Sequence, residues 1–292
     1  MPALPSPKAE KFCPPNPEPR APMSAATPPI FPSYRDRYLP AMTPSQIAAL
    51  PDKAWAPVII VTGAIEQHGP HLPVAVDSFL GQVWLDRTLP LLPADVNCYV
   101  APPITIGKSN EHTGFPGTLF VSKDTLRSLL HCIARQVHAW GFKQLAILNT
   151  HGGNSAVTAY TLREISAKYG LRCGTLAPKA DLGLPAQENN FGYHANTAET
   201  ALLLSNAPGT VDMSVAVCEY SGRIDDPGEL RAERAPATMA WITSDLSKSG
   251  IMGDAPAGTP ERGVKWTDLT AAAYAASMTD VARAGRSEFR AR

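Results

Sequence analysis

Two apolar runs, each followed at once by a polar loop and then by a helix, constrain the fold of this chain most strongly. Residues 56–62 precede a loop rich in Gly, Pro and His, and residues 143–149 precede a turn that contains Gly152 and Gly153. Continuous apolar runs of this length are typical of strands buried on both faces, and their alternation with helices favours parallel pairing. We therefore predict an α/β protein whose mainly parallel sheet is covered by helices on both faces.

The remaining elements follow the same alternation. Further strands are predicted at residues 98–101 and 171–176, and helices at 44–50, 78–89, 123–140, 154–169, 199–206 and 264–283. Helical periodicity predicts that two of these helices each bury one face. The face of the helix at 123–140 comprises Leu126, Leu129, Leu130, Ile133, Val137 and Trp140, and that of the last helix comprises Leu269, Ala273, Ala276 and Val281. Because such sheets bind ligands at the carboxyl ends of their strands, we expect the chemistry in the loops that follow strands.

The proline content is concentrated at the N-terminus. Of the 29 prolines, 11 lie within the first 32 residues, where few residues are able to form a core. We predict that residues 1–33 form a Pro-rich extension that is disordered or loosely draped, and that residues 34–292 form a single domain. A polyproline ligand or a subunit-contact arm is the alternative interpretation of the extension.

Charge and composition exclude several classes of partner. The chain has 26 Lys and Arg residues and 26 Asp and Glu residues, so it lacks the net basic charge that favours nucleic acid or anionic membranes. No apolar run approaches the roughly 20 residues of a transmembrane helix, and no secretion signal is evident. The five cysteines are odd in number and include no C-x-x-C pair, which argues against a disulfide framework. We therefore expect a cytoplasmic protein with no nucleic-acid or membrane partner.

A cluster of metal-ligand residue types follows the first apolar run. Glu66, His68, His71 and Asp77 lie within twelve residues, and the first two are spaced so that an extended segment can direct both towards one point. Imidazole and carboxylate are ligands that zinc, manganese and iron(II) accept, so the cluster indicates a metal site. Asp77 also qualifies as the N-cap of a helix that begins at Ser78, and His71 as a structural histidine.

Three further segments contain candidate site residues. His151 follows the second apolar run, beside two glycines that permit a tight turn; a phosphate cradle there is disfavoured because no matching Gly-rich motif accompanies it. His194 precedes an apolar helix with Glu199 at its start, where the acid would also complement the helix dipole. Residues 107–118 are polar and Gly-rich, which is consistent with a loop that closes over a ligand or with an ordinary hairpin.

Taken in order, these segments resemble the motifs of the creatininase (creatinine amidohydrolase) family. The matching segments are residues 66–73 (EQHGPHLP) with Asp77, 115–118 (FPGT), 149–154 (NTHGGN), His194 with 199–200, and 253–254 ahead of 261–263. The resemblance extends from about Pro44 to the C-terminus. It implies a three-layer α/β/α domain with a dinuclear metal centre that hydrolyses C–N bonds in small cyclic amides, formamides or short peptides.

The resemblance also implies roles for individual residues. One metal would be bound by Glu66 and His151, the other by His68, with Asp77 bridging the two. Glu199 is the candidate for the remaining carboxylate. His194 matches the proposed proton shuttle and Ser109 a serine that contacts substrate, and Lys108 and Tyr193 are further candidates for orienting it.

One departure from the family pattern bears on the substrate. Members that act on creatinine have a Tyr and a ligating Glu where this chain has Gly152 and Gly153. The glycines open space beside His151, so creatinine is not the expected substrate. We expect another small amide, with a non-peptide C–N bond and in particular a cyclic amide as the preferred class.

The implied cofactors are two divalent ions per chain, with zinc, manganese and iron all suited to the ligands. A closed homo-oligomer, such as a hexamer, is the assembly that the resemblance implies. The alternative functions are a non-catalytic metal-binding scaffold and an interaction protein that acts through its Pro-rich extension. A serine or cysteine hydrolase is disfavoured because the chain has no G-x-S-x-G motif and no Cys beside a Gly-rich turn.

Overall fold

The computed structural model describes residues 31–178, 180–221, 230–231, 237–238 and 240–290. The predicted Pro-rich extension therefore lies outside the described residues except for its last three. No helix within the described part is both long enough and apolar enough to span a membrane. The four cysteines there, Cys98, Cys132, Cys173 and Cys218, are all free thiols.

The centre of the domain is a four-stranded parallel sheet in the order β2-β1-β3-β4. Its strands are β1 (Pro57–Thr62), β2 (Tyr99–Val100), β3 (Gln144–Asn149) and β4 (Arg172–Thr175). β1 and β3 pair along their whole length, so Thr62 and Asn149 end side by side. The Thr62 hydroxyl donates a hydrogen bond of 2.8 Å to Asn149 Oδ1. This pairing brings the loops after both strands to one edge of the sheet.

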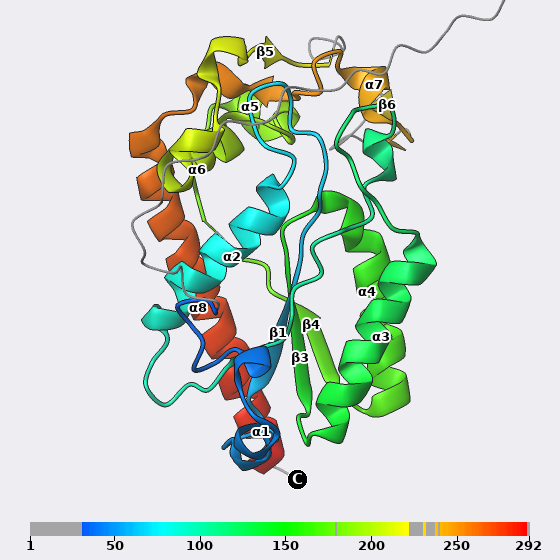
Figure 1. Cartoon of the computed structure of the whole chain (residues 1–292), viewed down its shortest axis with the longest axis vertical. Helices are drawn as coiled ribbons and strands as arrows, with labels where there is room; N and C mark the ends of the chain where they lie inside the picture. The colour runs from blue at the N-terminus through cyan, green and yellow to red at the C-terminus, as the bar shows by residue number, and fades with distance from the viewer. Residues whose placement is uncertain (1–30, 179, 222–229, 232–236, 239, 291–292) are drawn as a thin grey trace, which may run out of the picture. The chain divides into compact units, whose positions relative to one another are not determined.

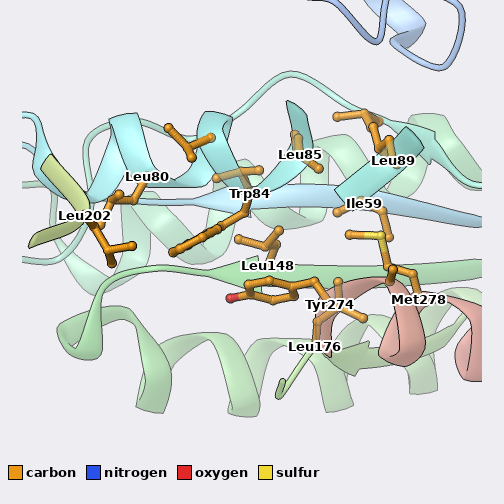
Figure 2. Packing of buried hydrophobic residues seen from close by; sticks show 14 of the residues in the cluster. Ile59, Leu80, Trp84, Leu85, Leu89, Leu148, Leu176, Leu202, Tyr274 and Met278 are labelled. Atoms are coloured by element: carbon orange, nitrogen blue, oxygen red, sulfur yellow. The ribbon is translucent and has the colours of Figure 1, made fainter. Parts of the chain in front are cut away.

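Helices cover both faces of the sheet, as the sequence predicts. α2 (Val76–Thr88) and α8 (Pro260–Arg290) lie on one side, and α3 (Lys123–Ala139) and α4 (Ser155–Tyr169) lie on the other (Figure 1). Side chains of β1 alternate between the two layers: Ile59 and Val61 join the cluster under α2 and α8, whereas Val58 and Ile60 join the cluster under α3 and α4. Figure 2 shows the first cluster, where Trp84 of α2 lies near Tyr274 of α8.

Short elements complete the domain at the carboxyl edge of the sheet and at its opposite end. They are α1 (Pro44–Ala49), α5 (Ala186–Phe191), α6 (Thr197–Asn206), α7 (Thr243–Leu246), β5 (Cys218–Glu219), β6 (Leu230–Arg231), β7 (Ala237–Thr238) and β8 (Gly253–Asp254). β5 pairs antiparallel with β8, and β6 pairs parallel with β7. α6 packs against α8, which places the loop before α6 above the central strands.

The element types match the predictions, but two helix faces differ. Leu129 of α3 and Trp140, which follows the helix, are 41% and 42% exposed, because the buried face of α3 comprises Leu126, Leu130, Ala134 and Val137. In α8, Leu269 is 39% exposed. The buried apolar residues of α8 are Trp266, Ala271, Tyr274, Ala275, Met278 and Ala282, and of the predicted face Val281 packs against this core as expected.

The start of α2 also differs from the prediction. Asp77 is the second residue of the helix rather than its N-cap, which is Ala75 with no side-chain hydrogen bond. The Asp77 carboxylate is therefore free of a capping role and is buried. Its backbone oxygen accepts a hydrogen bond of 2.8 Å from the Thr150 hydroxyl, which ties the start of α2 to the end of β3.

Candidate metal centre

Five side chains from four separate segments converge above the carboxyl ends of β1 and β3. Glu66 and His68 lie in the loop after β1, Asp77 in the first turn of α2, His151 just after β3, and Glu199 in the first turn of α6. These are the five predicted ligands. They form two groups whose ligand atoms lie within 4.8 Å of one another, Glu66–Asp77–His151 and His68–Asp77–Glu199. Asp77 belongs to both.

The first group surrounds one nitrogen of His151. His151 Nδ1 lies 3.1 Å from Glu66 Oε2 and 3.3 Å from Asp77 Oδ2. The other ring nitrogen, Nε2, lies 3.1 Å from the Lys108 backbone oxygen, to which a proton on Nε2 can be donated. Nδ1 therefore faces the carboxylates and can present its lone pair to a cation that displaces its proton, the orientation that metal-ligating histidines commonly adopt.

The second group is arranged in the same way around His68. His68 Nδ1 lies 3.1 Å from the Glu66 backbone oxygen, which fixes the ring, and Nε2 lies 3.5 Å from Asp77 Oδ1 and 3.9 Å from Glu199 Oε2. Asp77 therefore directs one oxygen towards each histidine. A carboxylate in this position is suited to bridge two ions.

Several polar atoms of the cluster are buried without a hydrogen-bond partner, and they indicate whether these residues fit a metal. Glu66 Oε2, His68 Nε2 and Asp77 Oδ2 are buried and have no hydrogen-bond partner of acceptable geometry among the described residues. Burying such atoms without a partner is costly, and native proteins seldom do so. Because these atoms belong to the two groups and are types that bind zinc, manganese and iron(II), the residues fit a pair of divalent ions.

The electrostatics of the cluster favour positive charge. Burial opposes protonation of both ligand histidines, but Asp77 outweighs it and raises the pKa of His68 to about 9. Contacts with Asp77, Glu111 and Glu66 likewise overcome burial and raise the pKa of His151 to about 12. Burial raises the pKa of Glu199 to about 7. The carboxylates thus create a negative potential that a cation can neutralise.

His194, the predicted proton shuttle, lies beside this cluster but outside both shared groups. Its Nε2 lies 2.7 Å from the Gln67 backbone oxygen, and its Nδ1 lies 3.7 Å from Glu66 Oε1. Burial lowers the pKa of His194, so the ring is neutral at neutral pH. The next residue, Ala195, adopts a left-handed backbone with φ of 51°, and its N–H donates to Glu199 Oε2. This turn ties the backbone beside His194 to the Glu199 carboxylate.

The sequence analysis did not assign a role to His112, which orients Glu66. Its Nε2 lies 3.3 Å from Glu66 Oε1, and its Nδ1 accepts a hydrogen bond of 2.8 Å from the Gln67 side-chain amide. Glu66 Oε1 is thereby held while Oε2 remains directed at Asp77 and His151. Ile104 forms a β-bridge with Thr62 at the end of β1, so the segment after Ile104 lies at the same edge of the sheet. Because such sheets bind ligands at the carboxyl ends of their strands, this position could have indicated His112.

A cavity of about 520 Å³ opens beside the cluster. Its lining comprises Glu66, Glu111, His112, His151, Gly152, Gly153, Ser155, Tyr193, His194, Trp241 and Met252. The rings of Tyr193 and Trp241 lie 6.0 Å apart at one wall, and Trp241 is a site residue that the sequence analysis did not single out. A volume of this size is in the range of small-molecule sites.

Two of the predicted substrate contacts lie elsewhere. Ser109 is fully buried with its Oγ 3.3 Å from His151 Nε2, and it does not line the cavity that the described residues form. The Lys108 ammonium contacts the Asn110 side chain. The part of Lys108 that lies at the site is its backbone oxygen, which supports His151.

Asn154 joins the loops that hold the cluster. Its side-chain N–H₂ donates to the Gly63 backbone oxygen at 3.0 Å, and its Oδ1 accepts from the Lys108 N–H at 2.8 Å. Asn154 is fully buried and follows the His151 turn. One side chain therefore connects the loops after β1, β2 and β3.

The fold and the cluster define an α/β/α protein with a buried histidine–carboxylate site at the carboxyl edge of a parallel sheet. The family model for creatininase, described as creatinine amidohydrolase, matches residues 40–278. The chain therefore belongs to the creatininase family of hydrolases.

The similar proteins differ in the substrates that their names state. The chain is 31% identical to the mycofactocin precursor peptide peptidase of Mycolicibacterium smegmatis over 209 residues, which are 70% of this chain and 77% of that protein. It is 32% identical to the 3-dehydro-scyllo-inosose hydrolase of Thermotoga maritima over 96 residues, or 32% of this chain and 30% of that protein.

Solved structures confirm the fold. A structure described as creatininase Mn superimposes with a TM-score of 0.64 at 21% identity, covering 87% of this chain and 98% of its own. A second creatininase structure gives a TM-score of 0.63 at 21% identity with the same coverage. At this identity the likeness establishes the architecture, which is the predicted three-layer arrangement.

Proposed function

We propose that this protein is an amidohydrolase with two divalent ions per chain, and that it cleaves an amide C–N bond. The observation that carries the proposal is the position of Asp77, whose two oxygens face His151 and His68 separately while Glu66 and Glu199 complete the two groups. Buried carboxylate oxygens without a partner are costly, and the two found among the described residues, Glu66 Oε2 and Asp77 Oδ2, both lie in this cluster. Zinc, manganese and iron(II) suit the ligands, and one structural neighbour is described with manganese.

The ligand assignments follow from the two groups. Glu66 and His151 would hold one ion and His68 and Glu199 the other, with Asp77 between them. Bound divalent ions supply Lewis acidity and make a water molecule nucleophilic near neutral pH. His112 keeps Glu66 Oε1 in place, so that Oε2 is available to the first ion.

The proton transfer is assigned to His194. Its Nε2 is engaged by the Gln67 backbone oxygen, so Nδ1 is the atom able to accept a proton and deliver it to the leaving nitrogen. Burial keeps the ring neutral and therefore able to accept. Tyr193 and Trp241 form the wall against which the substrate would be oriented.

A short peptide is the substrate class that we favour. Gly152 lines the cavity without a side chain, and no other atom lies within 4 Å of the position its Cβ would take, which leaves room for a chain that extends past the reacting bond. The space beside Gly153 is not free, because Glu111 occupies it. The relative that matches over most of its length is named as a peptidase, which favours a peptide over the non-peptide bond expected from the sequence. A cyclic amide is the second candidate, because it fits the same cavity volume.

A hydrolysis screen tests the proposal. Metal-loaded wild-type protein would be incubated with short peptides, lactams and formamides, beside a chelated sample and a Glu199→Gln variant. We expect turnover of at least one amide class that chelation abolishes and that re-addition of metal restores. Turnover that is unaffected by chelation would contradict the proposal, and metal binding without turnover of any amide would favour the scaffold alternative.

A further inference from the structure

Glu111 is the carboxylate of the cavity that belongs to neither of the two groups that share Asp77; it lies within ligand distance of Glu66 and His112. It lies in the loop after β2, next to His112, with a side chain that is 20% exposed. Its Oε1 lies 3.2 Å from His151 Nε2, the nitrogen that faces away from Glu66 and Asp77. His151 thus has carboxylates on both sides, two at Nδ1 and one at Nε2.

Gly153 explains how Glu111 reaches this position. A Cβ on Gly153 would overlap Glu111 Oε1, His151 Nε2 and the Lys108 backbone oxygen. The His151 ring is buried and the Lys108 oxygen is backbone, so a movement of the Glu111 side chain alone would not relieve the overlap. The space that Gly153 leaves is therefore occupied by the carboxylate of Glu111, which arrives from a different loop.

We propose that Glu111 is a positioning residue for His151: its carboxylate holds the proton on Nε2 and so directs the Nδ1 lone pair to the metal. The inference rests on the proposed function. The Lys108 oxygen at 3.1 Å and the Ser109 hydroxyl at 3.3 Å surround the same nitrogen, but both are neutral. What Glu111 adds is negative charge, which increases the basicity of the ligand nitrogen. Carboxylates behind metal-bound histidines commonly act in this way, and their loss costs 10–100-fold in metal affinity.

Glu111→Gln is the direct test, because glutamine keeps the shape and removes the charge. Zinc affinity would be measured by chelator competition, and the absorption of the cobalt-loaded protein would report the coordination number. We expect a fall in affinity of about 10–100-fold with unchanged absorption per bound cobalt. Glu111→Asp, which retains the charge with a shorter reach, should recover part of the affinity.

Glu164→Gln is the matched control. Glu164 Oε2 lies 3.2 Å from His131 Nε2 on the outer surface of α3 and α4, so this variant removes a similar contact away from the site. Its zinc affinity should equal that of the wild type. Unchanged affinity in Glu111→Gln would overturn the inference, as would a rise in cobalt absorption, which would make Glu111 itself a ligand. A wild-type protein that binds no zinc would instead refute the proposed function.

Discussion

Single atoms decide what the site is able to do. Asp77 directs Oδ1 to His68 and Oδ2 to His151, and each histidine has its other nitrogen against a backbone oxygen. The ring orientations are therefore set by the backbone, and the nitrogens that face Asp77 are left for a ligand. Such preorganisation reduces the cost of assembling a metal site.

The proton shuttle can be separated from metal binding by mutation. His194→Asn should lower kcat by about 10²–10⁴-fold, because the general acid–base group is removed. Metal content should stay at the wild-type level, because the two proposed ions are assigned to the groups that share Asp77. His194 also lies within ligand distance of Glu66 and His68, so a loss of metal would assign it to the ligands instead. Steady-state kinetics with the best amide from the screen, together with elemental analysis, would check both. A variant with wild-type kcat would show that the proton is transferred elsewhere.

Metal affinity should depend on pH with a definite sign. The pKa of His68 is raised to about 9 and that of His151 to about 12, so both rings are protonated near neutral pH and an ion must displace their protons. Affinity should therefore increase as the pH rises towards about 9, with protons released on binding. Calorimetry in buffers of different ionisation enthalpy measures this release. Metal binding that releases no protons would contradict the raised pKa values of His68 and His151.

The sequence was sufficient to nominate Glu66, His68 and Asp77, because they follow one strand within a few residues. The structure places these residues together with His151 and Glu199, although metal binding itself stays a prediction. Residues 107–118 were predicted to close over a ligand or to form a hairpin, but His112 and Glu111 were not nominated individually, because the sequence does not show which side chains of this loop reach Glu66 and His151. The path of this loop depends on the buried hydrogen bonds of Asn154, which are tertiary contacts.

At the scale of elements, periodicity predicted the helices but not always the face that they bury. Leu129 and Leu130 are adjacent in α3, and a helical stripe can be drawn through either. The choice is made by tertiary packing, which places Leu130 and the small residue Ala134 in the core cluster that contains Val58 and Ile60 of β1. A small buried residue gives little signal in a hydrophobic pattern, and the same explanation applies to the alanines of α8.

Substitution of two neighbouring residues tests which face of α3 is buried. Leu130→Ala should reduce the free energy of unfolding by about 2–5 kcal/mol, because it leaves a cavity in the core under the sheet. Leu129→Ala should change it by less than about 0.5 kcal/mol, since the side chain is 41% exposed. Urea denaturation of both variants gives the comparison. Equal losses would mean that the two residues are buried alike.

At the scale of the molecule, the N-terminal extension is predicted to be dispensable for chemistry. We propose that the domain that folds and acts begins near residue 31, since the Ser33 hydroxyl contacts Asp86 of α2. A protein that lacks residues 1–30 should retain metal content and amide turnover. Loss of function with an intact fold would favour the interaction-protein alternative. Light scattering of both forms would also test the homo-oligomer that the family resemblance implies.

The number of metal ions per chain tests the central claim most directly. Wild-type protein and the Asp77→Asn variant would be loaded with zinc, manganese or iron(II), freed of excess metal and measured by elemental analysis. Because Asp77 belongs to both groups, we expect two ions per chain in the wild type and fewer than one in the variant, with unchanged circular dichroism. One ion or none in the loaded wild type, or two in the variant, would contradict a dinuclear centre bridged by Asp77.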